Sequence, residues 1–297
     1  MSDDPLWPRA QAIFTPDSEQ SVNVALLGVP ASRTSLSPTH AHLTPHAIRD
    51  ALARYSTYSW SHDRDLRDLT AVDAGDIHEP DGPEGEARVI DRVRTLRDRA
   101  HLLIALGGDN SITYAVGVGA LGPDLSQAGL VTLDAHHDLR EGSSNGSPVR
   151  RLIEAGLPGR NVVQIGIADF SNSRQYADRA RELGITVIKR DELRRRSPQE
   201  VMGHALSVAT QGGGSVHVDL DVDVCDRAEV PGCPASAPGG ISADELRQLA
   251  YCAALSPRVG SIDITEIDAS ADAADGRTVR LGALLVLESM LGLLCRQ

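Results

Sequence analysis

The sequence predicts an α/β fold with three layers, α/β/α, built on a mainly parallel, doubly wound sheet. Short apolar runs such as Leu102–Leu106 and Gly129–Leu133 are typical of strands that are buried on both faces. Segments with helical periodicity alternate with these runs along the whole chain, which is the pattern of βαβ units. No linker-like composition divides the chain, so we expect a single catalytic domain over residues 1–297.

The first half of the chain is predicted to contain four strands, at 22–27, 66–72, 102–106 and 129–133, of which the second is the weakest pattern. Pro45 opens a helical segment from a favourable first-turn position. A second helix is expected over 84–99, because Val89, Val93 and Leu96 fall on one face. A third helix is expected after Ser111.

The second half continues the alternation. Pro148 starts a helix that Gly156 ends, and Ser242 with Glu245 forms a capping box at the start of another. The remaining expected helices lie at 177–183, 198–210 and 279–294, and the expected strands lie at 162–165, 185–188, 215–218 and 259–264.

Composition narrows the function classes. The chain is 41% hydrophobic and 24% charged, as in ordinary globular proteins, and its net charge is −12. This charge argues against nucleic acid and anionic membranes as partners. The four cysteines form no C-x-x-C pair, the chain opens without an apolar signal segment, and no stretch approaches the ~18 apolar residues of a membrane helix. A cytoplasmic protein is expected.

Acidic residues follow four of the predicted strands. The first strand end carries Asp109, and the second carries Asp134 and Asp138 with His136 between them. The third carries Asp219, Asp221, Asp223 and Asp226, and the fourth carries Glu266. Because the carboxyl ends of parallel strands meet at one edge of the sheet, these side chains should converge where α/β proteins bind ligands. So many carboxylates would repel one another strongly unless cations were present. The alternative, that some aspartates only cap helices, suits Asp226.

The residue types favour manganese. Asp221 and Asp223 are two apart, so on a strand both would point to the same side. Oxygen-rich ligation with imidazole and without thiolate favours Mn²⁺ over Zn²⁺. Two ions roughly 3.5–4 Å apart can share a water and bring its pKa towards ~7, which makes a hydroxide nucleophile at neutral pH. Asp138 would accept a hydrogen bond from it.

Four motifs, GGDNS (107–111), DAHHD (134–138), DLDVD (219–223) and IDITEID (262–268), resemble the signatures of the ureohydrolase (arginase/agmatinase/formimidoylglutamase) family. The resemblance implies an arginase-like fold, a binuclear Mn²⁺ cluster, a homo-oligomer, and hydrolysis of linear amidines or guanidines by a metal-bound hydroxide. It implies that Asp134 and Asp221 bridge the ions and that Asp138 serves one of them. His136 and Asp223 would serve the other. Glu266 would pair with the cationic head of the substrate.

The sequence departs from the family pattern in three places. Asn110 stands where a His usually follows GGD, and an amide oxygen is a weaker ligand than imidazole, so one metal site is expected to be weak. Asn145 and its neighbours replace a His of some members, and Asp219 replaces a Ser. These departures motivate an alternative of another class, a metal-poor homologue that binds a ligand without turnover. His137 is expected to lie outside the metal site.

The substrate tail is less constrained by the sequence. Arg140, two residues after a proposed metal ligand, would suit an anionic substrate end, whereas Arg150 and Arg151 are expected to be structural. The D-L-R and S-S-x-G segments and the later Ser-Asn-Ser at 171–173 resemble formimidoylglutamases, while GSPVRRLIEAG resembles agmatinases. We predict hydrolysis of formimidoylglutamate, a compound of histidine metabolism, to glutamate and formamide. The runner-up is an agmatinase or guanidino-acid hydrolase that releases urea. Arg140, Asn145 and Glu266 are the predicted substrate-binding residues, and Asp138 and Glu266 are the predicted catalytic ones.

Overall fold

A computed structural model describes residues 4–296, and its central feature is a nine-stranded sheet in which every pair of neighbouring strands is parallel. The strand order is β1-β5-β2-β6-β11-β10-β7-β8-β9. The strands are β1 (Phe14–Pro16), β2 (Val22–Val29), β5 (Ala71–Asp76), β6 (Ala100–Gly107), β7 (Gly129–Leu133), β8 (Val162–Ile167), β9 (Thr186–Lys189), β10 (Val216–Asp221) and β11 (Val259–Thr265). A small antiparallel hairpin, β3 (Tyr58–Ser59) and β4 (Arg64–Asp65), stands apart from the sheet.

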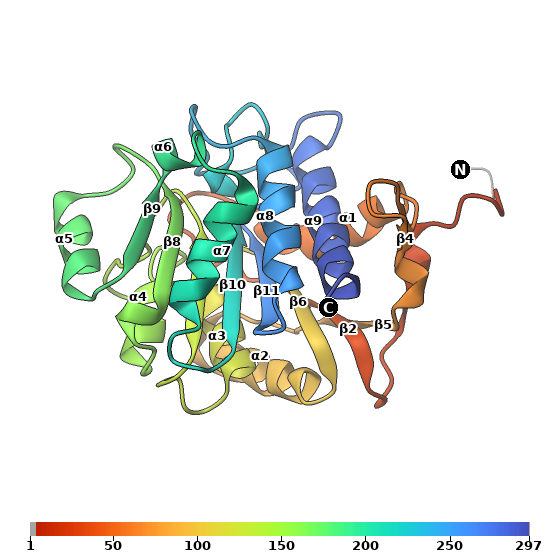
Figure 1. The fold of residues 1–297 in the computed structure, drawn as a ribbon, viewed down its shortest axis with the longest axis horizontal. Coiled ribbons are helices and arrows are strands. Elements are labelled where there is room, and N and C mark those ends of the chain that lie inside the picture. The colour runs from red at the N-terminus through yellow and green to blue at the C-terminus, as the bar shows by residue number, and fades with distance from the viewer. Residues whose placement is uncertain (1–3, 297) are drawn as a thin grey trace.

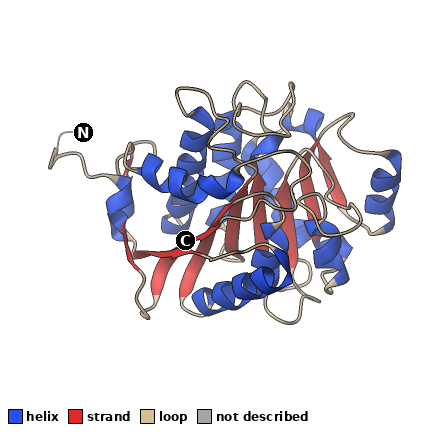
Figure 2. Cartoon of the chain, turned by 180° about the vertical axis from the view of Figure 1, so that it is seen from behind, coloured by secondary structure: helices blue, strands red, loops and turns tan. Residues whose placement is uncertain are grey.

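Helices cover both faces of the sheet, which confirms the predicted three-layer arrangement. One face packs against α1 (Thr44–Leu52), α7 (Pro198–Ala209), α8 (Ala243–Leu255) and α9 (Arg277–Leu294), and α7 and α8 lie in front of the strands in Figure 1. The opposite face, seen from behind in Figure 2, packs against α2 (Gly82–Arg97), α3 (Ile112–Leu121), α4 (Pro148–Glu154) and α5 (Arg174–Glu182). A short helix, α6 (Arg190–Leu193), follows β9 directly.

The apolar runs predicted to be buried strands form strands at the centre of the sheet. All residues of β7, β10 and β11 are buried, because helices cover both faces of these strands. Within the described residues, no helix has the length and the apolar character that a membrane crossing requires.

The strand predicted at 66–72 is wrong in its position. Residues Leu66–Asp68 form a 3-10 turn, and the strand β5 begins only at Ala71. The Asp65 carboxylate accepts a hydrogen bond from the Arg67 N–H and so starts the turn. Parallel pairing with β2 then begins at Ala71, opposite Val24. The strand β1 at the edge of the sheet was not predicted.

Strand order decides where the acidic side chains meet. The strands β6, β11, β10 and β7 are consecutive neighbours in the sheet, although they are far apart in the sequence. All four run parallel, so the loops that follow them lie side by side at one edge.

Candidate metal centre

The predicted site residues converge on one pocket of about 320 Å³ at this edge of the sheet. Eight of them line it: Asn110, His136, Asp138, Arg140, Asn145, Asp221, Asp223 and Glu266. The ninth, Asp134, is buried and accepts a hydrogen bond from the His136 N–H at 2.6 Å. The structure therefore brings together side chains from four neighbouring strand ends.

Asp134, His136 and Asp223 form a compact group in which one ligand atom from each lies within 4.8 Å of the others. The His136 Nδ1 is 2.7 Å from the Asp223 Oδ2 and 3.4 Å from the Asp134 Oδ1. The Asp223 Oδ1 accepts the Ala135 N–H at 2.9 Å, which ties the turn after β10 to the loop after β7.

Asp221 and Asp223 do not follow the strict strand alternation that the sequence predicted. The strand β10 ends at Asp221, and Val222–Val224 form a 3-10 turn. The Asp221 Oδ1 accepts the Asp223 N–H at 2.8 Å, so the first carboxylate caps the turn that carries the second. Both side chains still face the pocket.

Asp138 and Glu266 have left-handed backbone conformations, with φ of 52° and 64°. This conformation is unfavourable for residues other than glycine and is often found where a side chain must point into a functional site. Glu266 is buried, and its Oε1 accepts the Asn110 N–H at 2.8 Å and the Asn145 Nδ2 at 2.9 Å. The carboxylate is therefore fixed from two sides.

The acidic side chains strongly perturb one another. Burial raises the pKa of Asp134 to about 6, and the nearby Asp223 adds to the rise. Burial and then Asp109 raise the pKa of Glu266 to about 7. Burial alone would lower the pKa of His136, but the hydrogen bonds and charges of Asp134 and Asp223 outweigh it and raise that pKa to about 12.

These residues fit a metal ion of the Mn²⁺ type. The Asp134 Oδ2 is buried and has no hydrogen-bond partner among the described residues, which is costly unless a cation or proton is nearby. The available donors are carboxylate oxygens and one imidazole, and this set suits Mn²⁺. Cys225 and Cys233 are free, buried thiols, and neither lines the pocket.

Asn110 has an orientation that bears on the weak site expected there. Its Nδ2 donates to the Asp138 Oδ2 at 2.6 Å. Its Oδ1 accepts from the hydroxyls of Thr113 and Thr265, at 2.7 and 3.2 Å. The amide thus turns its nitrogen to the pocket, and a rotation would be needed before the oxygen could act as a ligand. Its role as a ligand stays a prediction.

The segment around His136 is held by two amides that sequence reasoning did not assign to the site. Asn172 accepts the His137 N–H and donates to the Ala135 carbonyl, both at 2.9 Å. Gln164 accepts from the His137 Nδ1 at 2.7 Å and donates to the His137 carbonyl at 2.9 Å. His137 is therefore a buried structural residue. A polar residue such as Gln164 within an apolar strand needs a hydrogen-bond partner, and this was the sequence feature that could have indicated its role.

The arginines divide as expected. Arg150 donates to the Arg140 carbonyl and pairs with Glu154. Arg151 makes a two-pronged pair with Glu86 at 2.7 Å. The side chain of Arg140 is exposed at the pocket and has no ion pair or hydrogen bond within residues 4–296. Other lining residues were missed, among them Leu36 and Ser37 in the Ser- and Pro-rich loop after β2, and Tyr176.

Comparison with known proteins agrees with this geometry. The sequence profile of the Arginase family matches residues 22–292. The chain belongs to the Arginase family. A formimidoylglutamase from Halalkalibacterium halodurans is 35% identical over 294 residues, which cover 96% of this chain and 92% of that protein. The resemblance drawn from the four motifs is thus confirmed.

Solved structures of this family share the fold. A crystal structure of formimidoylglutamase from Bacillus subtilis superimposes with a TM-score of 0.92 at 30% identity, covering 100% of this chain and 95% of that one. A formiminoglutamase from Trypanosoma cruzi, crystallised with Mn²⁺, has a TM-score of 0.91 at 22% identity and covers 98% of this chain and 100% of its own. The arginase-like α/β/α fold is confirmed.

Replacing Asn172 by alanine is expected to weaken Mn²⁺ binding by about 10- to 100-fold, because partners that orient the residues of a metal site contribute that much to affinity. The change removes both hydrogen bonds that hold the backbone on either side of His136. Titration of the chain with Mn²⁺ measures the effect. Asn23→Ala is the matched control, since it also removes side-chain bonds, to Thr70, but far from the site. Equal affinities in the two variants would contradict the role of Asn172.

Mn²⁺ binding is expected to release protons and to strengthen as the pH rises from 6 to 8. In the metal-free chain the raised pKa of Asp134, about 6, keeps this carboxyl group partly protonated at the lower end of this range, and His136, whose pKa is raised to about 12, stays protonated. Ligands must lose their protons to bind a metal, so each proton released gives about tenfold in affinity per pH unit. Calorimetric titration in buffers of different ionisation enthalpy counts the protons and ions. An affinity independent of pH would refute this electrostatic description.

Proposed function

We propose that this chain is a Mn²⁺-dependent hydrolase of formimidoylglutamate that produces glutamate and formamide. The proposal rests on one arrangement. Buried carboxylates, including Glu266, line the pocket, and Arg140, which has no ion pair within residues 4–296, lies exposed at its edge. A substrate with a cationic amidine at one end and carboxylates at the other matches both ends. Two relatives that are named formimidoylglutamase, at 35% and 30% identity to this chain, support the same substrate.

The geometry of the site supports a proposal for the residues that would hold the metal. We propose two ions, with Asp134 and Asp221 shared between them, Asp138 serving one, and His136 and Asp223 serving the other. When bound, Mn²⁺ would supply Lewis acidity and a water of lowered pKa. The orphaned Asp134 Oδ2 and the pairing of His136 with two carboxylates are the observations that favour a cation here.

The chain's own residues position the two reactants. Glu266 holds the amidinium, because its buried carboxylate is oriented by Asn110 and Asn145. Asp138 orients the attacking water and takes a proton from it. The water oxygen bonds to the amidine carbon, the bond from that carbon to the glutamate nitrogen breaks, and the nitrogen leaves with a proton. A homo-oligomer and a cytoplasmic location stay predictions of the sequence.

The alternatives are less well matched. Agmatine carries a second cation at its far end, which would meet Arg140 and be repelled. A metal-poor binding protein would not require four carboxylates and two imidazoles around one pocket, since such a cluster without a cation is costly. Formimidoylglutamate is therefore the favoured substrate.

A two-substrate assay tests the proposal. The Mn²⁺-loaded chain is incubated separately with formimidoylglutamate and with agmatine, and formamide and urea are measured. Formamide from the first substrate, with little urea from the second, is expected. Urea from agmatine without formamide would replace the proposal by an agmatinase. No product from either substrate would contradict the proposal and leave a guanidino-acid hydrolase and the binding protein as the alternatives.

A further inference from the structure

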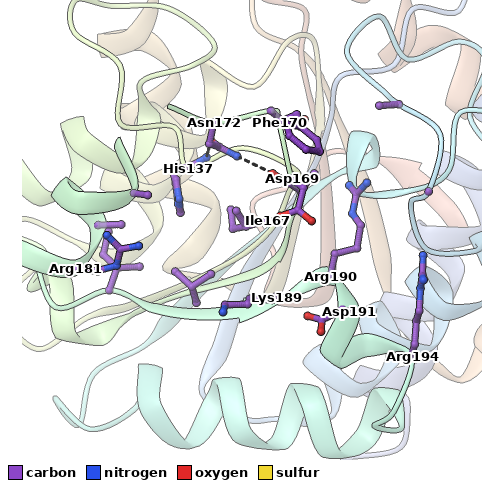
Figure 3. Close-up of a pocket in the computed structure, with 18 of the residues that line it drawn as sticks. His137, Ile167, Asp169, Phe170, Asn172, Arg181, Lys189, Arg190, Asp191 and Arg194 are labelled. Carbon is purple, nitrogen blue, oxygen red and sulfur yellow. Dashed lines mark hydrogen bonds between the residues drawn. The ribbon is translucent and has the colours of Figure 1, made fainter. Parts of the chain in front are cut away.

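A second cavity, larger than the metal pocket, lies beside it. Its volume is about 660 Å³, against about 320 Å³ for the metal pocket. It is bounded by the end of β8, by the edge strand β9 and by the helices α5 and α6, as Figure 3 shows. The carboxyl ends of parallel strands are the usual place for ligands in such folds, and this cavity is at that edge.

The lining of this cavity is amphipathic. Ile167, Ala180, Ile185 and Val187 supply an apolar wall. The charged members of the lining are Arg181, Lys189, Arg190, Arg194, Asp169 and Asp191, so four cations face two carboxylates. The chain as a whole has a net charge of −12, which makes a cavity with excess positive charge an exception on this protein.

The cations are incompletely neutralised. Lys189 and Arg194 make no side-chain hydrogen bond or ion pair with any residue between 4 and 296, whereas Arg181 pairs with Asp178. Arg190 donates from Nε to the Gly166 carbonyl at 3.1 Å, but its Nη2 is buried without a partner there. Positive groups that share one cavity repel one another, and a bound anion would relieve both the repulsion and the unpaired donors.

We propose that this cavity is a second ligand site, which binds a short aliphatic dicarboxylate. The apolar wall would contact the methylene chain, and the unpaired cations at two places, the end of β9 and the residue after α6, would each bind a carboxylate. The ligand would not enter the metal pocket, because His137 and Asn172 form a wall that lines both spaces. This site is independent of the proposed hydrolysis.

Calorimetric titration of the full-length, Mn²⁺-loaded chain with glutarate tests the proposal in the absence of substrate. We expect saturable binding, which the double variant Lys189→Gln/Arg194→Gln weakens at least tenfold. The double variant Arg54→Gln/Arg160→Gln is the matched control, because it removes two exposed charges that line no cavity described here. It should bind glutarate like the unaltered chain.

Two further measurements make the test decisive. Glutaramide, the uncharged analogue of glutarate, should not bind in this cavity. Arg140→Gln, at the metal pocket, should leave in place the glutarate binding that depends on Lys189 and Arg194. The proposal is overturned if the unaltered chain gives no binding, if the Lys189→Gln/Arg194→Gln variant binds equally well, if glutaramide binds as tightly, or if Arg140→Gln abolishes binding. Because no substrate is present, failure of the amidine hydrolysis assay would not alter any of these results.

Discussion

Replacing Asp134 by alanine is expected to abolish stable Mn²⁺ binding and to lower kcat/KM for the amidine substrate by about 10²- to 10⁴-fold. Asp134 is buried, orients His136 through its backbone N–H, and keeps one carboxylate oxygen free of any other partner in the described chain. Removing one member of a buried charged group costs about 3–5 kcal/mol, and each 1.36 kcal/mol is tenfold in rate.

Metal content after dialysis and kcat/KM with formimidoylglutamate measure this effect. Asp124→Ala is the control, since Asp124 is an exposed loop aspartate that only accepts a hydrogen bond from the Ser126 N–H. It should keep both metal and activity. If Asp134→Ala retained two ions per chain and turnover within tenfold of the unaltered chain, the proposal that Asp134 is a metal ligand would have to be abandoned.

The sheet and its functional edge could be predicted from the sequence for a physical reason. Buried parallel strands must be apolar, so each is an apolar run, and a polar cluster after such a run marks the carboxyl end. All carboxyl ends of a parallel sheet face one way, which is enough to place these groups at one edge. That is why Asn110, Asp138, Asp221 and Glu266 could be grouped in advance. That their strands are neighbours, as a single pocket requires, is seen only in the structure.

The short turns that begin at an aspartate side chain could not be predicted from the apolar pattern of the sequence. The 3-10 turn at Leu66 and the turn after Asp221 both depend on an aspartate that accepts the N–H two residues ahead. Apolar periodicity carries no information on such bonds, so a strand was assigned to the first segment and a strict alternation to the second. The amide orientation of Asn110 likewise depends on Thr113 and Thr265, which only the folded chain brings near it.

Two of the buried central strands contain carboxyl groups within them. Asp219 and Asp263 lie opposite each other on β10 and β11, and both are buried. The His217 Nε2 is 3.3 Å from the Asp263 Oδ2 and offers a partner. Burial and then Asp263 raise the pKa of Asp219 well above its usual value, which favours the protonated form of Asp219 beside a second buried carboxyl group.

Replacing Glu266 by glutamine is expected to lower kcat/KM for formimidoylglutamate by about 10²- to 10³-fold while the Mn²⁺ content stays unchanged. Glutamine keeps the shape and can still accept from the Asn110 N–H and the Asn145 Nδ2, which hold Glu266 in place. It loses only the negative charge, and removing one partner of a buried charge pair costs about 2–5 kcal/mol. The loss should therefore appear with the cationic amidine and not in metal binding.

Steady-state kinetics together with metal analysis separate this role from a structural one. Glu229→Gln, which removes an exposed charge outside the pocket, is the control and should behave like the unaltered chain. Burial and then Asp109 raise the pKa of Glu266 to about 7 when no cation is bound, so the substrate must favour the ionised carboxylate when it enters. The comparison is made at pH 8, where Mn²⁺ binding is expected to be strongest, so that the loss of charge at position 266 is separated from loss of metal. A variant within threefold of normal kcat/KM would mean that the amidinium is held by another group.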